Sequence, residues 1–308
     1  MFAHRVDLER REAGGDQGLR PAPASPTQRE IMTRMTRLLA ASLALLLSAC
    51  ANINAPTYDG PARTFETSFE ALADFDGFYI VPPGDYASSH ELSSEKVQHG
   101  SYAHKAWIVA ARASTNDGPE YLPHRAYPTI QLQKTTDGIY RTPCLVSLWA
   151  NLDISLVDRP AGNIDDWFSF VTLTPDSSDN WSRTVLVNIG PDGYARLMHV
   201  PRQGEQTYIY QASLATDPGG ALKYVYREWV RLDVYMDFSA AGGYAKVWQN
   251  GDLVSHAAVE GGQGGLAQAH FGLYASAAIP SGTIYNDRLR IMEIAGEAEA
   301  AALVSAGW

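Results

Sequence analysis

The chain has 308 residues, with 24 Lys and Arg against 34 Asp and Glu, and from residue 50 onward the balance is 17 against 29. This acidic excess argues against nucleic acid as a partner, because binding to nucleic acid needs clustered positive charge. The two cysteines are Cys50 and Cys144. Cys144 precedes the apolar run LVSLW, so we expect it to be a small buried hydrophobic residue.

The N-terminal segment 32–49 predicts a secretory signal. Arg34 and Arg37 precede a short apolar run that ends in Leu47-Ser48-Ala49, directly before Cys50. This ending resembles a bacterial lipobox, in which the cysteine is acylated, for instance with palmitate, after cleavage. The alternative, a transmembrane anchor, is disfavoured because about 12 apolar residues are too few to span a bilayer. Residues 1–31 show no apolar periodicity, and we expect them to be an extension upstream of a misassigned start.

The lipobox resemblance also gives an expectation for location. The residue after Cys50 is Ala51 and not Asp, and in lipoproteins of this kind that implies the outer membrane. We therefore expect a cell-envelope protein whose only membrane attachment is the lipid at Cys50, with its body facing either the periplasm or the outside. Residues 50–66 would be a linker, 67–295 the domain and 296–308 a C-terminal tail.

Beyond the linker the sequence has the pattern of short strand-like runs and turns that is typical of an all-β protein. Short runs rich in β-branched and aromatic residues alternate with turn residues. The predicted strands are 105–112, 129–134, 144–155, 167–174, 184–189, 194–200, 207–211, 229–238, 244–249, 252–256, 269–275 and 282–294. Asn250-Gly251 predicts a tight hairpin, since both positions tolerate positive φ. A dozen strands in one unit favour a jelly-roll β-sandwich, and only the tail is typical of a helix.

Several of these strands have one apolar and one unusual polar side. In 144–155, Trp149 and Asn151 point away from the side of Leu148. In 269–275, His270 and Tyr274 point away from the side of Phe271. Indole, amide, imidazole and phenol groups stack on sugar rings and bond to hydroxyls, so we interpret these sides as one ligand-binding trough; ordinary solvated surface is the alternative.

The C-terminal third resembles the closing strands of concanavalin A-like jelly-roll polysaccharide lyases, the heparin-, glucuronan- and alginate-lyase groups. The resemblance rests on Trp229, Trp248-Gln249-Asn250-Gly251, Gly272-Leu273-Tyr274 and Tyr285-Asn286-Asp287. It covers about 70 residues well, and it is more specific for the fold than for activity. One departure is His270, which stands where those lyases commonly have Lys.

The resemblance implies β-elimination on a uronate-containing polysaccharide. Such a reaction needs a base for the C5 proton, a group that stabilises charge on the carboxylate, and an acid for the leaving oxygen. Tyr274 would be base and acid, as the matching tyrosine is in those enzymes. We expect His270, Gln131, His124 and Arg125 to surround the carboxylate.

Further residues are candidates for substrate binding. They are Trp149, Asn151, Lys105, Tyr127, His199 and Arg202. A structural interpretation stands beside each: His199 would be a half-buried strand histidine satisfied by backbone, and Lys105 and Arg202 would be solvated cations.

Other chemistries find less support. The Glu-x-Asp-x-x-Glu signature of laminarinase-like glycosidases is absent, as is the Gly-x-Ser-x-Gly elbow of serine hydrolases. No zinc motif occurs and no cofactor is expected. Residues 175–180, PDSSDN, have oxygen ligands suited to a structural calcium ion, with a plain turn as the alternative.

The leading hypothesis is therefore a lipid-anchored polysaccharide lyase with a polysaccharide or oligosaccharide as its partner. The second hypothesis, a non-catalytic glycan-binding lipoprotein, is favoured by His270 and by the acidic charge. The third is an envelope protein that uses the fold only as a spacer or for a protein partner.

Overall fold

The computed structural model describes residues 61–76, 78–80, 88–108, 124–126, 128–131, 138–154, 168–177, 181–190, 192–202, 207–209, 222–275, 279 and 281–307. For 79–80, 88–89, 124–126, 128–131 and 207–209 it describes the backbone only. The predicted signal segment, Cys50 and Tyr127 lie outside the described residues.

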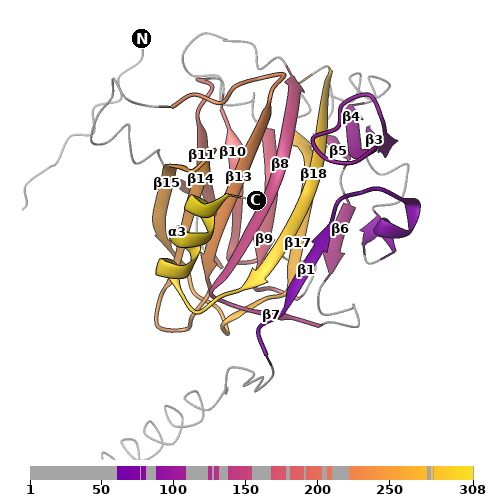
Figure 1. Ribbon diagram of the computed structural model, residues 1–308. Coiled ribbons are helices and arrows are strands. Elements are labelled where there is room, and N and C mark those ends of the chain that lie inside the picture. Colours follow the sequence, from indigo (N-terminus) through magenta and orange to yellow (C-terminus); the bar gives the residue numbers. More distant parts are fainter. Residues whose placement is uncertain are drawn as a thin grey trace, which may run out of the picture. The chain divides into compact units, whose positions relative to one another are not determined.

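The described strands form two antiparallel sheets of eight strands each (Figure 1). Sheet A has the order β15 (Asp252–Val259), β14 (Gly243–Gln249), β13 (Trp229–Asp237), β8 (Cys144–Ile154), β18 (Gly282–Glu293), β4 (Ala103–Ile108) and β3 (Ser88–Ser93), and β1 (Thr64–Thr67) pairs with β18. Sheet B has the order β12 (Thr207–Ile209), β11 (Ala195–Val200), β10 (Thr184–Ile189), β9 (Phe168–Thr174), β17 (Gln268–Ala275), β6 (Pro128–Gln131) and β2 (Tyr79–Ile80), and β5 (His124–Ala126) pairs with β17. A two-stranded ribbon joins β7 (Tyr140–Arg141) and β16 (Gly265–Leu266).

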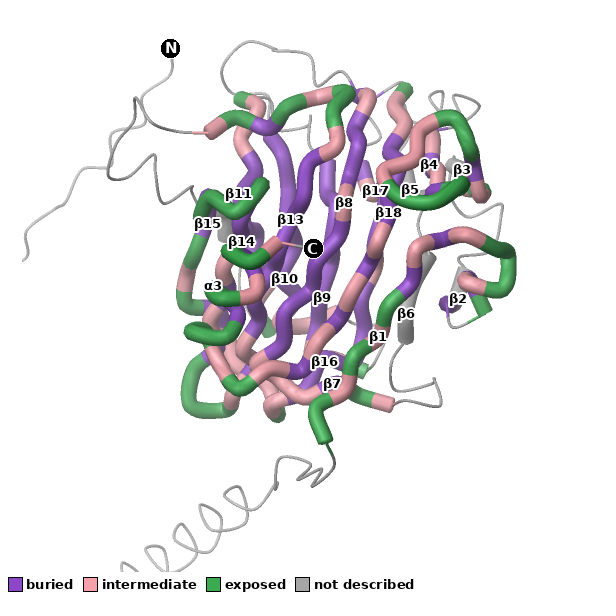
Figure 2. Tube along the Cα trace, viewed as in Figure 1, coloured by how far each residue is buried: buried purple, intermediate pink, exposed green. Residues whose placement is uncertain are grey.

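One continuous hydrophobic core lies between the two sheets. Sheet A contributes alternate residues of β8, such as Leu148 and Leu152, and sheet B contributes Phe271 and Leu273 of β17. All four are buried, and burial follows the middle of the central strands in Figure 2. Each such side chain stabilises the fold by about 1.5–3 kcal/mol through removal of apolar area from water. The predicted apolar sides are therefore confirmed as core.

The strand prediction is also confirmed in its main features, since each of the twelve predicted ranges overlaps a described strand. Residues 109–112, 132–134 and 210–211 of those ranges lie outside the described residues. Asn250 and Gly251 have φ of 53° and 93° and join β14 to β15, as the hairpin prediction requires. The strands without a prediction, such as β2, β5 and β7, are mostly two to four residues long, too short to show alternation. β1 begins at Thr64, inside the range expected to be linker.

The C-terminal tail forms the predicted helix, α3 (Glu297–Ala306), which packs on the outer face of sheet A (Figure 1). Ala300 and Val304 make a second, smaller apolar cluster with Leu145, Tyr235 and Trp248. Among the described residues, no helix is both long and apolar enough to span a membrane.

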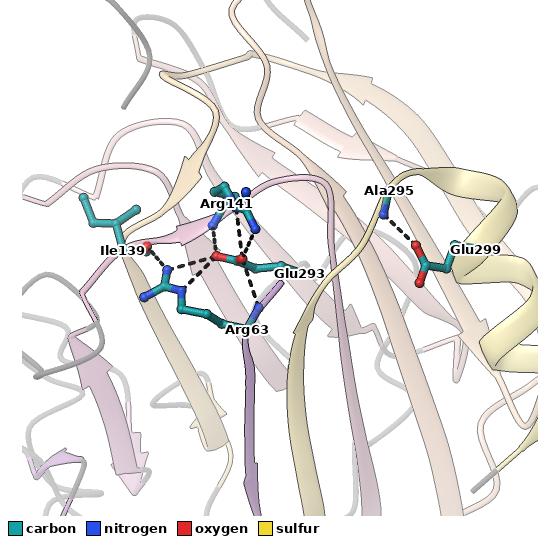
Figure 3. Close-up of polar contacts among 6 residues, drawn as sticks. All are labelled: Arg63, Ile139, Arg141, Glu293, Ala295 and Glu299. Carbon is teal, nitrogen blue, oxygen red and sulfur yellow. Dashed lines mark hydrogen bonds and ion pairs between the residues drawn. The ribbon is translucent and has the colours of Figure 1, made fainter. Parts of the chain in front are cut away.

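A buried carboxylate joins the start of the domain to its last strand (Figure 3). Glu293 of β18 accepts hydrogen bonds from the backbone N–H, Nε and Nη2 of Arg63 at 2.9–3.1 Å, and from the same three groups of Arg141 at 2.8–3.0 Å. Although desolvation alone raises it, the pKa of Glu293 lies below its ordinary value, because these donors favour the carboxylate. We call this group the Glu293 clasp.

Candidate functional site

The two residues at the centre of the sequence hypothesis, His270 and Tyr274, lie together on the outer face of sheet B. They are partly exposed, whereas Phe271, Leu273 and Ala275 on the same strand are buried in the core. His270 is opposite Thr172 of β9, and Tyr274 is opposite Ser169 of the same strand. The predicted division of β17 into an apolar and a polar side is therefore confirmed.

Gly272, between the two residues, has a backbone role. The register of β17 against β9 shifts between Phe271 and Tyr274, so that three steps along β17 match two along β9. Gly272 has φ of 125°, a conformation that residues with a Cβ rarely adopt. Such a bulge increases the local twist and redirects side chains, and here it sets Tyr274 opposite Ser169.

The backbone register extends from Tyr274 across five strands of sheet B. On one side its partner is Arg125 of β5, whose side chain is outside the description. On the other side, Ser169 is paired with Asn188 of β10, and Asn188 with Arg196 of β11. The row Arg125–Tyr274–Ser169–Asn188–Arg196 thus runs across the sheet, and we call it the tyrosine row.

Asn188 and Arg196 bring buried polarity to this row. Asn188 is 1% exposed and its Nδ2 donates to Sδ of Met198 at 3.7 Å, while its Oδ1 has no hydrogen-bond partner among the described residues. Arg196 is 8% exposed and forms an ion pair with Asp192. A buried carbonyl oxygen without a donor is costly, so Asn188 has the chemistry to accept a hydrogen bond from a ligand.

The indole of Trp181 contacts the ring of His270 edge to face. The ring centroids of Trp181 and His270 are 4.1 Å apart, with 61° between the ring planes. Trp181 is placed by the turn between β9 and β10. In that turn Asp176 Oδ2 accepts from both the backbone N–H and the hydroxyl of Ser182 at 2.9 Å, and Thr174 donates to the Ser182 carbonyl at 2.8 Å.

The remaining catalytic candidates lie on strands next to β17. Gln131 of β6 is the backbone partner of Gln268, whose own side chain donates to the Asp176 carbonyl at 2.8 Å. His124 of β5 is the partner of the core residue Ala275. The structure thus brings His270, Tyr274, Gln131, Arg125 and His124 onto three adjacent strands of one sheet.

Three of the substrate-binding candidates lie elsewhere. Trp149 and Asn151 belong to β8, and Lys105 to β4, so all three are in sheet A. Because they alternate with core residues there, they face away from sheet B, on the opposite side of the sandwich. The prediction of a single trough is therefore wrong. Alternation assigns a residue to one side of its own strand, but it does not say which of the two sheets the strand joins.

His199 has the structural role that was the alternative to substrate binding. It is buried, on the β11 side that carries Ala195 and Leu197. Its Nε2 accepts from the backbone N–H of Glu260 at 3.1 Å, and its Nδ1 lies 3.2 Å from the Thr184 carbonyl. Nδ1 therefore carries the proton, and both ring nitrogens are occupied. Burial lowers its pKa, which favours this neutral form.

Arg202 lies just after β11, apart from the tyrosine row. Its backbone N–H donates to the Glu260 carboxylate at 2.6 Å. No group of three or more His, Cys, Asp or Glu side chains suited to a metal occurs among the described residues. In the segment considered for calcium, residues 178–180 lie outside the described residues, and Asp176 Oδ2 holds Ser182.

Four residues of this face were missed from the sequence: Ser169, Trp181, Asn188 and Arg196. The alternation of 194–200 held a usable signal, because Arg196 falls opposite to Ala195 and Leu197. Trp181 follows directly after the segment considered only for calcium. Nothing local marked Ser169 and Asn188, which gain their place from pairing with distant strands.

Comparisons with known proteins agree with the fold. Neither a protein-family model nor a curated protein matches the sequence. Among solved structures, the endo-β-1,4-glucuronan lyase from the fungus Trichoderma reesei is similar with a TM-score of 0.51 and 13% identity, over 75% of this chain and 95% of that one. The fold is the jelly-roll β-sandwich.

Two other solved structures are similar at lower scores. The cellulose-induced protein Cip1 has a TM-score of 0.49 and 12% identity, over 74% of this chain and 96% of its own. The receptor-binding domain of botulinum neurotoxin type G has a TM-score of 0.46 and 9% identity, over 78% of this chain and 50% of its own.

Proposed function

We propose that the outer face of sheet B is the active site of a polysaccharide lyase that acts on a uronate-containing glycan. The observation that carries the proposal is the tyrosine row, in which Tyr274 lies between Arg125 on one side and Asn188 and Arg196 on the other. The row has a cationic residue on the neighbouring strand, Arg125, and a second one, Arg196, three strands from Tyr274. Positive charge on this face would favour the ionised phenol and stabilise the charge that builds up on a carboxylate, and the Asn188 oxygen would accept from a sugar hydroxyl.

In this mechanism the Tyr274 oxygen takes the C5 proton of the uronate. The electron pair of that C–H bond forms the C4–C5 double bond, the C4–O bond to the next sugar breaks, and Tyr274 returns the proton to the departing oxygen. Arg196 and Arg125 stabilise the negative charge that builds up on the carboxylate. His270, held by Trp181, and Gln131 donate to the sugar or to its carboxylate.

The test is an assay of uronate polymers, among them glucuronan, alginate and heparin-type chains, for the ultraviolet absorbance of the unsaturated product. Tyr274→Phe should lower turnover by about 10²–10⁴-fold and leave the unfolding transition unchanged. Tyr244→Phe is the matched control, because it removes a phenol oxygen from β14 of sheet A, where that oxygen lies 2.7 Å from Nδ1 of His256. Absence of product from every polymer would refute the proposal.

A second function, glycan binding without turnover, has one specific observation in its favour. Arg196 is already paired with Asp192, which reduces the positive charge available to a carboxylate. In that case uronate oligosaccharides would bind equally to the wild type and to Tyr274→Phe, and no unsaturated product would form. Formation of the unsaturated product therefore distinguishes the two functions, whereas Asp192→Asn, which frees Arg196, should raise affinity for an anionic glycan under either one.

We also propose that the protein is a lipoprotein of the outer membrane, attached through Cys50. The support is the lipobox-like sequence Leu47-Ser48-Ala49-Cys50. Cells grown with labelled palmitate should label the protein and should fail to label Cys50→Ser. Label in that variant, or recovery of the wild type with the inner membrane, would contradict the proposal.

A further inference from the structure

We propose that the outer face of sheet A carries a second carbohydrate site, separate from the tyrosine row, which binds an uncharged polysaccharide chain. The geometry brings three partly exposed tryptophans to this face: Trp107 of β4, Trp149 of β8 and Trp229 of β13. All three occupy strand positions that alternate with core residues, so they point to the side of the sandwich opposite His270 and Tyr274.

Backbone register fixes how the tryptophans are arranged. Trp229 is opposite Asn151, and Trp149 lies two residues before Asn151 on the same side of β8, so Trp149 and Trp229 are diagonal neighbours about 7–8 Å apart. Across β18, Asn151 is opposite Tyr285 and Tyr285 is opposite Lys105. Trp107 lies two residues beyond Lys105, on the same side of β4.

Asn151, Tyr285 and Lys105, which lie between the tryptophans, are held in place by hydrogen bonds and ion pairs. Lys96 donates to Asn151 Oδ1 at 3.1 Å, and the Tyr285 hydroxyl donates to Glu95 at 2.6 Å. Lys105 also contacts Glu95, at 2.6 Å. Rigid polar side chains between aromatic rings lower the entropic cost of binding a ligand.

Charge balance identifies the ligand as uncharged. Near the tryptophans, this face has the cations Lys96, Lys105, Arg227 and Arg231, and the acids Glu91, Glu95, Asp153, Asp233 and Asp287. Lys105 pairs with Glu95 and Glu91, and Arg227 pairs with Asp153 at 2.8 Å. Arg231 pairs with Asp233 at 2.8 Å. Four cations against five acids leave no excess of positive charge to attract a uronate. Indole faces and fixed polar groups suit the C–H faces and hydroxyls of neutral pyranose rings.

The helix α3 covers the neighbouring part of the same face. It buries Trp248 and Tyr235, and Arg231 donates to the Val304 carbonyl at the end of the helix. Beyond the helix, Trp107, Trp149 and Trp229 keep part of their surface in contact with solvent. The three tryptophans are therefore distinct from the cluster that the helix uses for packing.

The experiment is affinity electrophoresis of the full chain through gels that contain hydroxyethylcellulose or laminarin, both uncharged. Trp149→Ala and Trp229→Ala should each weaken binding at least about tenfold, and Trp229→Phe, which keeps an aromatic ring, should retain part of it. Trp181→Ala is the matched control, because it removes a partly exposed tryptophan from the opposite face.

Each outcome decides the inference. The inference is supported if the gels retard the wild type, Trp181→Ala and Tyr274→Phe but not the sheet A variants, and if uronate oligosaccharides do not compete. This result supports it whether or not the lyase assay succeeds. Absence of retardation by both glucans, or equal loss in Trp181→Ala, overturns it. Near-ultraviolet circular dichroism of every variant confirms that the change in binding does not reflect unfolding.

Discussion

The Glu293 clasp offers a sharp test of how the domain is held together. Replacing Glu293 by Gln keeps the shape of the side chain but removes its charge and one of its two acceptor oxygens. Six N–H groups of Arg63 and Arg141 then compete for a single oxygen, and the new amide N–H₂ faces donors. The substitution should therefore lower the free energy of unfolding of the domain, although it lies far from any candidate site.

The magnitude follows from the burial of the three side chains. Breaking a fully buried ion pair costs about 3–5 kcal/mol. The Glu293 side chain is 3% exposed, but those of Arg63 and Arg141 are 19% and 34% exposed, so water can solvate the two cations after the change. We expect a loss of about 2–3 kcal/mol, which corresponds to a fall in Tm of about 5–10 °C for a domain of this size.

The assay is unfolding in guanidinium chloride at neutral pH, with Glu66→Gln as the matched control. Glu66 pairs with Arg290 at 2.8 Å, but its side chain is 50% exposed, so the same substitution should cost less than about 1 kcal/mol. Because the pKa of Glu293 is lowered in the native state, its contribution is present at neutral pH and is lost as the pH falls below about 4.3. Equal effects of the two substitutions, or a difference that persists in acid, would refute the reasoning.

Three further predictions concern buried or strained groups. Burial lowers the pKa of His90 and His104, so the free energy of unfolding should fall as the pH drops below about 6.5, and His104→Asn should flatten that dependence; an unchanged slope between pH 7 and pH 5 would contradict this. Burial raises the pKa of the Cys144 thiol, so in a Cys50→Ser chain a disulfide reagent should react only after denaturant is added. Gly272→Ala should cost about 1–3 kcal/mol because φ is 125° there, and a calorimetric scan that matches the wild type would show that the bulge tolerates a Cβ.

The strands were largely predictable because their signals are local. A run such as 144–154 alternates between core and outer positions, and Asn250-Gly251 supplies the positive φ that a tight hairpin needs. Very short strands such as β5 carry no such signal. Their pairing with β17 depends on residues about 150 positions away along the chain.

The sequence by itself determined which residues of a strand face the core, and so it identified His270 and Tyr274 as outer residues of one strand. Only the tertiary structure decided which outer residues share a face. Trp149, Asn151 and Lys105 lie on sheet A, whereas Ser169, Asn188 and Arg196 share a row with Tyr274 on sheet B. The reason is that alternation is a property of a single strand, whereas a face is made by the order in which distant strands pair, and in this sandwich β8 pairs with β13 and β18 while β17 pairs with β9.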